Sequence, residues 1–434
     1  MDISGKQSKL RGWRGLTALG ALAAALPFVA TAPASASPVY AYQQTIQIPG
    51  ASAATKFIGY DLAVFDPSNQ LYYLTDRSFN GIDVFSAKTS TFVTQIGTGL
   101  FAGVTASNDN AGPNGISLTN TPTGKLLVAG NGPSNLLTFN LDSTGLNLAA
   151  GTMPRTTSTA VMGTTPTPPN RVDGVAYAPG ANTILAANNA SNPGFLTLIN
   201  NADGSIKRSI LLNGAGAYPN VGANGVEATI YNTARNSFFV AVPTLTVNGN
   251  GDPADAGGVI ELDAANGNLL NTYDFNALGI TGPCSPTGLS QGAGASMLVA
   301  CSDGTAGHSV LLDPAGKGSL KLVNGISGGD QTSYDPARNV FFEAARFQVG
   351  GPVLGIIDAN SLSLQVIKIG ANDHSVAVDP VSGEVFVATA ATPNVPNCTN
   401  GCIAVFTPVP EPGTLPVLAV ALAGLGWVAR RRVR

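Results

Sequence analysis

The chain has few charged residues. Lys, Arg, Asp and Glu make up 11% of its 434 residues, against about 25% in a typical soluble domain. Uncharged polar and small residues take their place, and the 52 Gly and 29 Pro predict many turns. A hydrophobic content of 44% is enough for a large core, so this composition excludes a disordered chain.

The sign of the charge excludes one class of partner. The whole chain has a net charge of -3, but residues 1–36 carry +3 and the four arginines among the last five residues carry +4. Without these two ends the net charge is -10. Because a protein this acidic is repelled by phosphate backbones, we expect no nucleic-acid partner.

Histidine and cysteine are also scarce, with two and four copies. The histidines give no metal-ligand spacing and the cysteine pairs belong to different units, which argues against a zinc site. The cysteines instead indicate disulfides in an oxidising compartment. We favour a Cys284–Cys301 bond, because these residues face each other across a predicted hairpin, while Cys398 and Cys402 would close a small loop. The other pairings of four cysteines stay open.

The N-terminal residues 1–36 have the pattern of a secretory signal. A basic region precedes the apolar run Leu16–Ala30, and the small residues Ala34-Ser35-Ala36 follow. This order predicts a signal helix that is removed by signal peptidase. An uncleaved membrane anchor is the alternative, but the run is short for a span of about 20 residues.

Residues 37–408 repeat one unit of strand, tight turn and strand. The clearest copy is Asn372–Thr389, in which Asp379-Pro380 and Gly383 supply the turn. Seven such units follow one another at steps of 44 to 59 residues, with second strands that begin near Gln70, Lys125, Thr183, Ser237, Ser296, Val340 and Glu384. Seven units of up to four strands predict an all-β, seven-bladed β-propeller, with a β-solenoid as the alternative.

Two segments complete this prediction. The seventh unit lacks a fourth strand, and Gln43–Ile48 has the alternation to supply it, so an N-terminal strand is expected to close the ring. Ala149–Asn170, rich in Thr and Pro, is expected to be a long loop.

The last unit also resembles a known repeat type. Its segments Val376–Pro380, Val385–Ala388 and Ile403–Phe406 are similar to YVTN-type and NHL-type propeller repeats. The resemblance extends over most of Asp61–Phe406 and implies a seven-bladed fold. It implies little about activity, because propellers host many functions.

The tail, residues 409–434, contains the most specific motif. Val409-Pro410-Glu411-Pro412-Gly413 is followed by the apolar run Leu415–Ala429 and then by Arg430, Arg431 and Arg432. This order resembles the PEP-CTERM sorting signal of Gram-negative envelope proteins. The resemblance implies a hydrophobic transmembrane helix that anchors the precursor transiently in the inner membrane. It also implies cleavage by an exosortase near Pro-Glu-Pro and delivery to the cell surface or extracellular matrix. A plain C-terminal anchor is the alternative.

The first position of each unit is the candidate site. In chain order these residues are Asp61, Asn114, Asp173, Glu227, Pro286, Asp330 and His374. Inner strands line the channel of a propeller, so the side chains are expected to converge at one mouth. Carboxylate and amide oxygens suit Ca²⁺, which predicts a calcium site made by Asp61, Asn114, Asp173, Glu227 and Asp330, with His374 beside it. The alternative is that they are ordinary strand-start and turn residues.

These features favour a secreted, non-enzymatic propeller that binds a ligand, an exopolysaccharide or a matrix protein. The alternative is a metal-dependent propeller hydrolase that resembles the gluconolactonase/senescence-marker family. In that case Asp61, Asn114, Asp173 and Glu227 would hold the metal at the central channel. The chain has no clear match to that family's local motifs, and this favours binding over catalysis.

Overall fold

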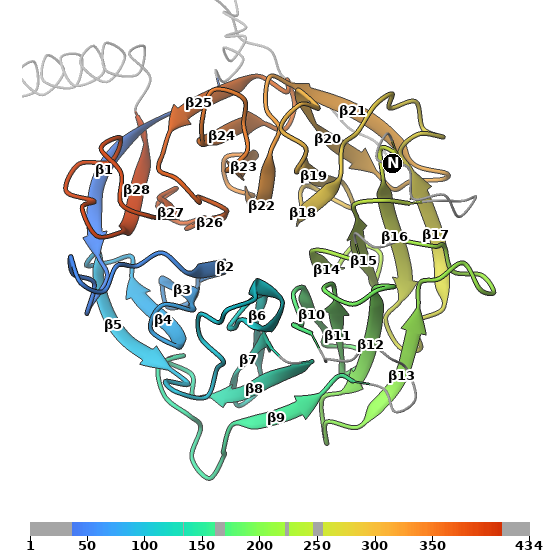
Figure 1. Ribbon diagram of the computed structural model, residues 1–434, viewed down its shortest axis with the longest axis horizontal. Coiled ribbons are helices and arrows are strands. Elements are labelled where there is room, and N and C mark those ends of the chain that lie inside the picture. The colour runs from blue at the N-terminus through green and yellow to red at the C-terminus, as the bar shows by residue number, and fades with distance from the viewer. Residues whose placement is uncertain (1–36, 133, 161–169, 222–224, 246–254, 410–434) are drawn as a thin grey trace, which may run out of the picture. The chain divides into compact units, whose positions relative to one another are not determined.

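The computed structural model describes residues 37–132, 134–160, 170–221, 225–245 and 255–409. Within these ranges the chain forms seven four-stranded antiparallel sheets, arranged as a ring around a central channel (Figure 1). This confirms the predicted all-β, seven-bladed propeller, whereas the YVTN/NHL subtype stays a prediction. The expected signal helix and sorting helix lie outside the described residues.

Each blade runs from an inner strand beside the channel to an outer strand at the rim. The inner strands are β2 (Tyr60–Asp66), β6 (Ile116–Thr121), β10 (Val175–Ala178), β14 (Thr229–Asn232), β18 (Pro286–Gln291), β22 (Gly329–Asp335) and β26 (Ser375–Val378). The second strands are β3 (Leu71–Asp76), β7 (Gly124–Asn131), β11 (Thr183–Asn188), β15 (Ser237–Val242), β19 (Met297–Cys301), β23 (Val340–Ala345) and β27 (Val385–Thr389). The third strands are β4 (Gly81–Ser86), β8 (Asn135–Leu141), β12 (Phe195–Asn200), β16 (Gly258–Asp263), β20 (His308–Asp313), β24 (Val353–Asp358) and β28 (Cys402–Val409). The outer strands are β5 (Thr91–Ile96), β9 (Arg155–Ser158), β13 (Ile206–Leu211), β17 (Leu269–Asp274), β21 (Ser319–Asn324), β25 (Leu364–Lys368) and β1 (Val39–Gln47), and a short 3-10 helix, η1 (Asn108–Asn110), precedes β6.

The ring is closed as the sequence predicts. The last sheet has the order β1-β28-β27-β26, so the N-terminal strand is the outer strand of the seventh blade. β1 pairs with β28 from Val39↔Val409 to Gln47↔Cys402, and it is longer than the predicted segment. Both ends of the ring are therefore paired, which removes two exposed strand edges.

One prediction about the second blade is wrong. The segment expected to be a long loop, Ala149–Asn170, contains the outer strand β9. Thr156 and Thr157 of β9 pair with Leu137 and Leu136 of β8, so the sheet completes its fourth strand there. Thr is a good strand former, and a neighbouring sheet edge decided the structure of this short polar segment.

Three of the turns between inner and second strands are built on Asp-Pro dipeptides. Asp66, Asp335 and Asp379 each precede a proline and accept a hydrogen bond from the backbone N–H two residues further on. These side chains close the turn locally while proline fixes its first backbone angle. The acids at these turns are thus structural, in contrast to those at the opposite ends of the same strands.

The hydrophobic core lies between the blades. Seven clusters of buried apolar residues each join two successive blades, and the last of them joins the seventh blade to the first. Six of the seven second strands are buried along their whole length, because they face a neighbour on both sides. This packing holds the inner strands in fixed positions around the channel.

Two disulfides brace the fifth and seventh blades. Cys284 is bonded to Cys301 and Cys398 to Cys402, which are the pairings favoured from the sequence. Pro286 pairs with Cys301 in the register of β18 and β19, so the first bond spans the predicted hairpin. Among the described residues, no helix is long and apolar enough to cross a membrane.

Candidate functional site

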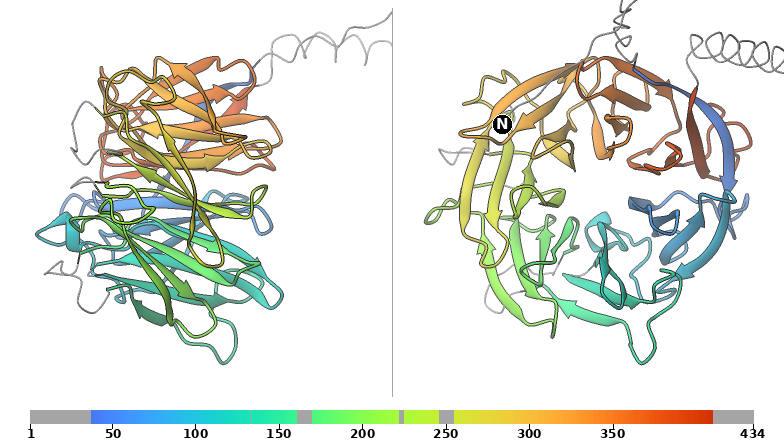
Figure 2. Two further views of the ribbon diagram at one scale, coloured as in Figure 1. Left: turned by 90° about the vertical axis from the view of Figure 1, so that its right-hand side faces the viewer. Right: turned by 180° about the vertical axis from the view of Figure 1, so that it is seen from behind.

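A cavity of about 520 Å³ opens at one end of the channel, where the inner strands begin. We call this the mouth face, and the opposite face, where the inner strands end, the far face (Figure 2). Five of the seven predicted first-position residues line the cavity: Asp61, Asp173, Glu227, Asp330 and His374. Asn114 and Pro286 are absent from its wall.

Glycines let the inner strands approach closely enough to form this wall. A Cβ atom on Gly115 would lie 1.9 Å from the carbonyl oxygen of Asp173, and one on Gly288 would lie 1.9 Å from that of Asp330. A Cβ atom on Gly174 would clash with the carbonyl oxygen of Glu227. The glycine after the first position therefore sets the spacing between neighbouring blades at the site.

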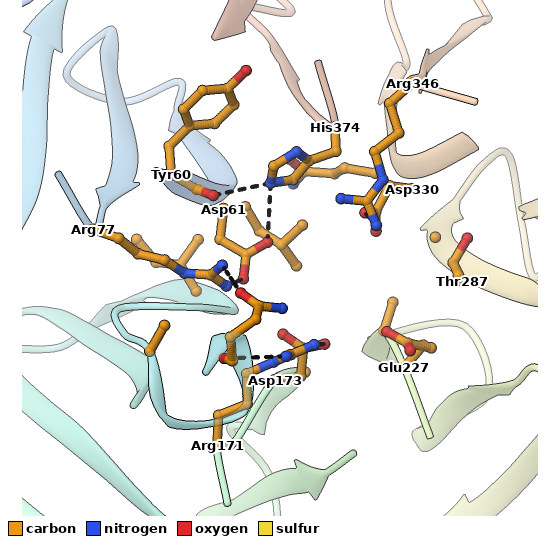
Figure 3. A pocket seen from close by; sticks show the side chains of 18 of the residues that line it. Tyr60, Asp61, Arg77, Arg171, Asp173, Glu227, Thr287, Asp330, Arg346 and His374 are labelled. Atoms are coloured by element: carbon orange, nitrogen blue, oxygen red, sulfur yellow. Dashed lines mark hydrogen bonds and ion pairs between the residues drawn. The ribbon is translucent and has the colours of Figure 1, made fainter. Parts of the chain in front are cut away.

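Asp61 is held by an arginine and a histidine. Arg77 binds its carboxylate, and Nε2 of His374 lies 3.5 Å from Oδ1 (Figure 3). Arg77 also donates to the Pro113 carbonyl and to Asn108 Oδ1. Burial acts to raise the pKa of Asp61, but Arg77 and His374 outweigh it, so the pKa lies well below its usual range. Asp61 is therefore an ionised carboxylate in a buried ion pair.

His374 is fixed on both sides of its ring. Nδ1 lies 2.7 Å from the Asn372 carbonyl and Nε2 lies 3.0 Å from the Tyr60 carbonyl. The imidazole stacks on the Tyr60 ring with a centroid distance of 5.0 Å. The ring is thus positioned by the backbone of the first and seventh blades.

A second group joins the third and fourth blades. Arg171 Nη2 lies 3.3 Å from Asp173 Oδ2, and Asn189 donates to the same oxygen at 2.6 Å and to Glu227 Oε1 at 3.4 Å. Desolvation and the charges of Asp173 and Asp330 raise the pKa of Glu227 well above its ordinary value, although Arg171 opposes them. Glu227 thus favours its neutral, proton-donating form.

A third group stands at the lip of the cavity in the sixth blade. Arg346 Nη2 lies 2.9 Å from Asp330 Oδ2, and its guanidinium carbon lies 4.6 Å from the centre of the Phe347 ring. Ile58, Val104 and Phe347 line the same opening and are 56%, 59% and 56% exposed. The cavity therefore has charged walls and an apolar lip.

Several buried polar atoms of the wall have no partner among the described residues. They include Nε of Arg171, Nε of Arg346 and the hydroxyl oxygen of Thr229. Thr229 as a residue is 7% exposed. A buried polar atom without a hydrogen bond is unfavourable. These atoms mark where a bound molecule would find free hydrogen-bonding groups.

Asn114 lies behind the wall and has a structural role. Its amide nitrogen donates to the carbonyls of Ala111 and Val172 at 3.0 and 2.8 Å, which links the second and third blades. Thr287, next to the predicted Pro286, lines the cavity from the fifth blade, together with Gly288, Leu289 and Ser302. The predicted ring is thus only partly brought together in one cavity.

The wall does not fit the predicted calcium site. Arginines occupy the carboxylates of Asp61, Asp173 and Asp330, and Asn114 is turned to backbone carbonyls. Within the described ranges, no three His, Cys, Asp or Glu side chains are placed to hold one metal ion. Calcium binding stays a prediction, one that this arrangement does not favour.

We expect the melting temperature to be the same in excess CaCl₂ and in EDTA. The arginines already balance the charge of the acids, so a cation would gain little by binding the folded state. Differential scanning fluorimetry at constant ionic strength measures this directly. A melting temperature that rises with CaCl₂ and falls with EDTA would show that a calcium site forms after all.

The arginines were missed at the sequence level, although a signal for them exists. Arg77 and Asn189 lie 16 residues after Asp61 and Asp173, and Arg346 follows Asp330 at the same distance. In these three blades the spacing leads from about the start of the inner strand to the residue after the second strand. A search of that second position would have found two of the three arginines, Arg77 and Arg346, but not Arg171, which precedes Asp173 by two residues.

Comparison with known proteins gives one sequence match and a general fold match. Residues 408–432 match the PEP-CTERM protein-sorting motif. The RRP9 WD40 repeats are 10% identical, cover 84% of this chain and 100% of their own, and give a TM-score of 0.54. A chain of the mitotic checkpoint complex is 11% identical, with coverages of 91% and 99% and a TM-score of 0.55. Hydrazine synthase of Kuenenia stuttgartiensis is 12% identical, with coverages of 79% and 96% and a TM-score of 0.54. These likenesses show the fold alone, and no curated protein matches the sequence.

Proposed function

We propose that this chain, which carries a PEP-CTERM signal and is therefore an exported protein sorted by an exosortase, binds a sugar unit in its central cavity without transforming it. Export from a Gram-negative cell and a final place at the cell surface or in the matrix belong to the same proposal. The sugar would be part of an envelope or matrix polysaccharide.

The charge balance of the wall carries the proposal. Asp61, Asp173 and Asp330 are each paired with an arginine, and the fourth acid, Glu227, favours its neutral form. The cavity is thus dense in hydrogen-bonding groups but close to neutral. Sugar hydroxyls both donate and accept, so they can meet the paired carboxylates and the free guanidinium N–H groups together.

The size and the lip of the cavity support the same ligand class. A volume of about 520 Å³ is within the range of about 300–1,000 Å³ found for small-molecule sites. The exposed ring of Phe347 offers an apolar surface for the C–H face of a sugar ring. Arg346 lies against that ring and also reaches Asp330, so it joins the apolar lip to the polar wall.

Arg346→Lys tests this proposal. We expect the secreted wild-type protein to bind neutral mono- or disaccharides by saturation-transfer NMR and calorimetry. Lysine keeps the charge but lacks the planar fork of donors, so the Kd should rise at least about ten-fold. Arg208→Lys is the matched control, because Arg208 also lies over an aromatic ring, Tyr218, but on the outer strand β13.

Three outcomes would contradict the proposal. If Arg346→Lys binds saccharides as the wild type does, the binding site lies elsewhere. If no saccharide binds in a panel of neutral, acidic and amino sugars, the ligand is not a sugar. Release of new reducing ends from an oligosaccharide would show that the protein hydrolyses its ligand, with Glu227 as the proton donor.

A further inference from the structure

The direction of the last strands fixes where the chain leaves the propeller. β26 begins at the mouth face, directly after His374, and runs toward the far face. Ser375 pairs with Ala388 and Thr389 pairs with Cys402, so β27 ends and β28 begins at the mouth. β28 therefore runs away from the mouth and ends at the far face with Val409.

The first strand begins at the same place. Gln47 pairs with Cys402 at the mouth, and Val39 pairs with Val409 at the far face. Ser37, two residues before Val39, bonds to Ser363 in the turn between β24 and β25, which also lies at the far face. In Figure 1, β1 and β28 lie side by side at the rim of the ring. Both the segment before Val39 and the segment after Val409 are thus attached to one face.

The sorting signal follows the last strand without a spacer. Its match begins at residue 408, inside β28, and the apolar run begins at Leu415. Five residues lie between Val409 and Leu415, and a fully extended chain of this length spans at most about 18 Å. A membrane-anchored precursor therefore keeps the end of β28 close to the bilayer.

We propose that, while the sorting signal anchors the precursor, the far face of the seventh blade lies at the membrane and the cavity mouth is turned away from it. The mouth is then open to a ligand before the exosortase releases the protein. The turn Asp379–Gly383, which joins β26 to β27 at the far face, is part of the surface nearest the lipid.

Two matched thiol labels test this orientation. Val381 lies in the far-face turn and is 63% exposed, whereas Val104 lies at the mouth and is 59% exposed. All four native cysteines are in disulfides, so Val381→Cys or Val104→Cys adds a single free thiol for a fluorescent maleimide. The labelled full-length chain is reconstituted into vesicles of lipids with nitroxide headgroups, which quench nearby dyes.

We expect quenching at position 381 to be at least about two-fold stronger than at position 104. The same labelled chains ending at Val409, mixed with the same vesicles, should show no quenching at either position. Equal or stronger quenching at position 104 would overturn the proposal, and so would a lack of quenching at both positions in the anchored chain. The test measures orientation only, so it stands independently of the ligand proposed above.

Discussion

Arg77→Met is expected to destabilise the protein by about 3–5 kcal/mol, the range for removing one partner of a buried ion pair. Arg77 and Asp61 are both more than nine-tenths buried, and the arginine binds Asp61, Asn108 and the Pro113 carbonyl. Methionine fills a similar volume but leaves a buried carboxylate without its main counter-charge. Equilibrium unfolding in urea at pH 7 measures the loss.

Three further variants, Asp61→Asn, the double variant and a control, show whether the ion pair is the cause. In the double variant Asp61→Asn/Arg77→Met no carboxylate is left unpaired, so its loss should be smaller than the sum of the two single losses by at least about 1 kcal/mol. Arg338→Met is the control, because its partner Asp335 keeps two backbone N–H donors. Additive losses in the double variant would mean that Arg77 acts only through its packing.

The propeller itself could be predicted because its signals are local and repeated. Asp-Pro turns, alternating strands and the recurrence of the unit at six steps of 44 to 59 residues all indicate the same repeat, and the missing strand of the last unit points to the N-terminus. Fourth strands were expected in six of the seven units, but the place of β9 was assigned to a loop because Arg155–Ser158 is short and polar. Its structure is decided by the free edge of β8, which no local pattern reveals.

The site could be predicted only in part for a related reason. Asp61, Asp173, Glu227, Asp330 and His374 were placed at one mouth from their equivalent positions, and the structure brings them to one cavity. Their charge partners come from other positions. Arg171 lies two residues before Asp173. Arg77 and Arg346 each lie in the same blade as the acid that they bind, but after its second strand. Acids without visible partners suggested a cation, and the arginines supply that charge instead.

A second large effect is expected from a pair of acids inside the first blade. Asp76 and Asp83 are almost completely buried at the mouth end of β3 and on β4. Burial, and then the charge and hydrogen bond of Asp83, raise the pKa of Asp76 to about 9. Burial likewise raises the pKa of Asp83 to about 6. Among the described residues Oδ2 of Asp76 has no hydrogen-bond partner, and we expect the two carboxyls to share a proton.

This pair makes the free energy of unfolding depend on pH. In the unfolded chain Asp76 titrates near pH 4, whereas in the folded protein it keeps its proton up to about pH 9. The stabilisation from the shared proton is therefore complete below about pH 4 and is lost as the pH rises through about 9. Asp76→Asn supplies a permanent donor of the same shape, and its Oδ1 can still accept from the Phe79 N–H.

We expect Asp76→Asn to match the wild type near pH 5 and to exceed its stability by about 3 kcal/mol or more at pH 9, since one pKa unit corresponds to about 1.4 kcal/mol. Urea unfolding at several pH values gives the difference directly. Burial raises the pKa of Glu343 to about 8, so this residue titrates in the same pH window. It does so in both proteins, and its contribution cancels in the difference between their free energies of unfolding. Asp203→Asn, the same change at an exposed turn, should leave the pH profile parallel to the wild type. A parallel profile for Asp76→Asn as well would show that the proton is not shared, because the stability would then be insensitive to the charge of this carboxyl.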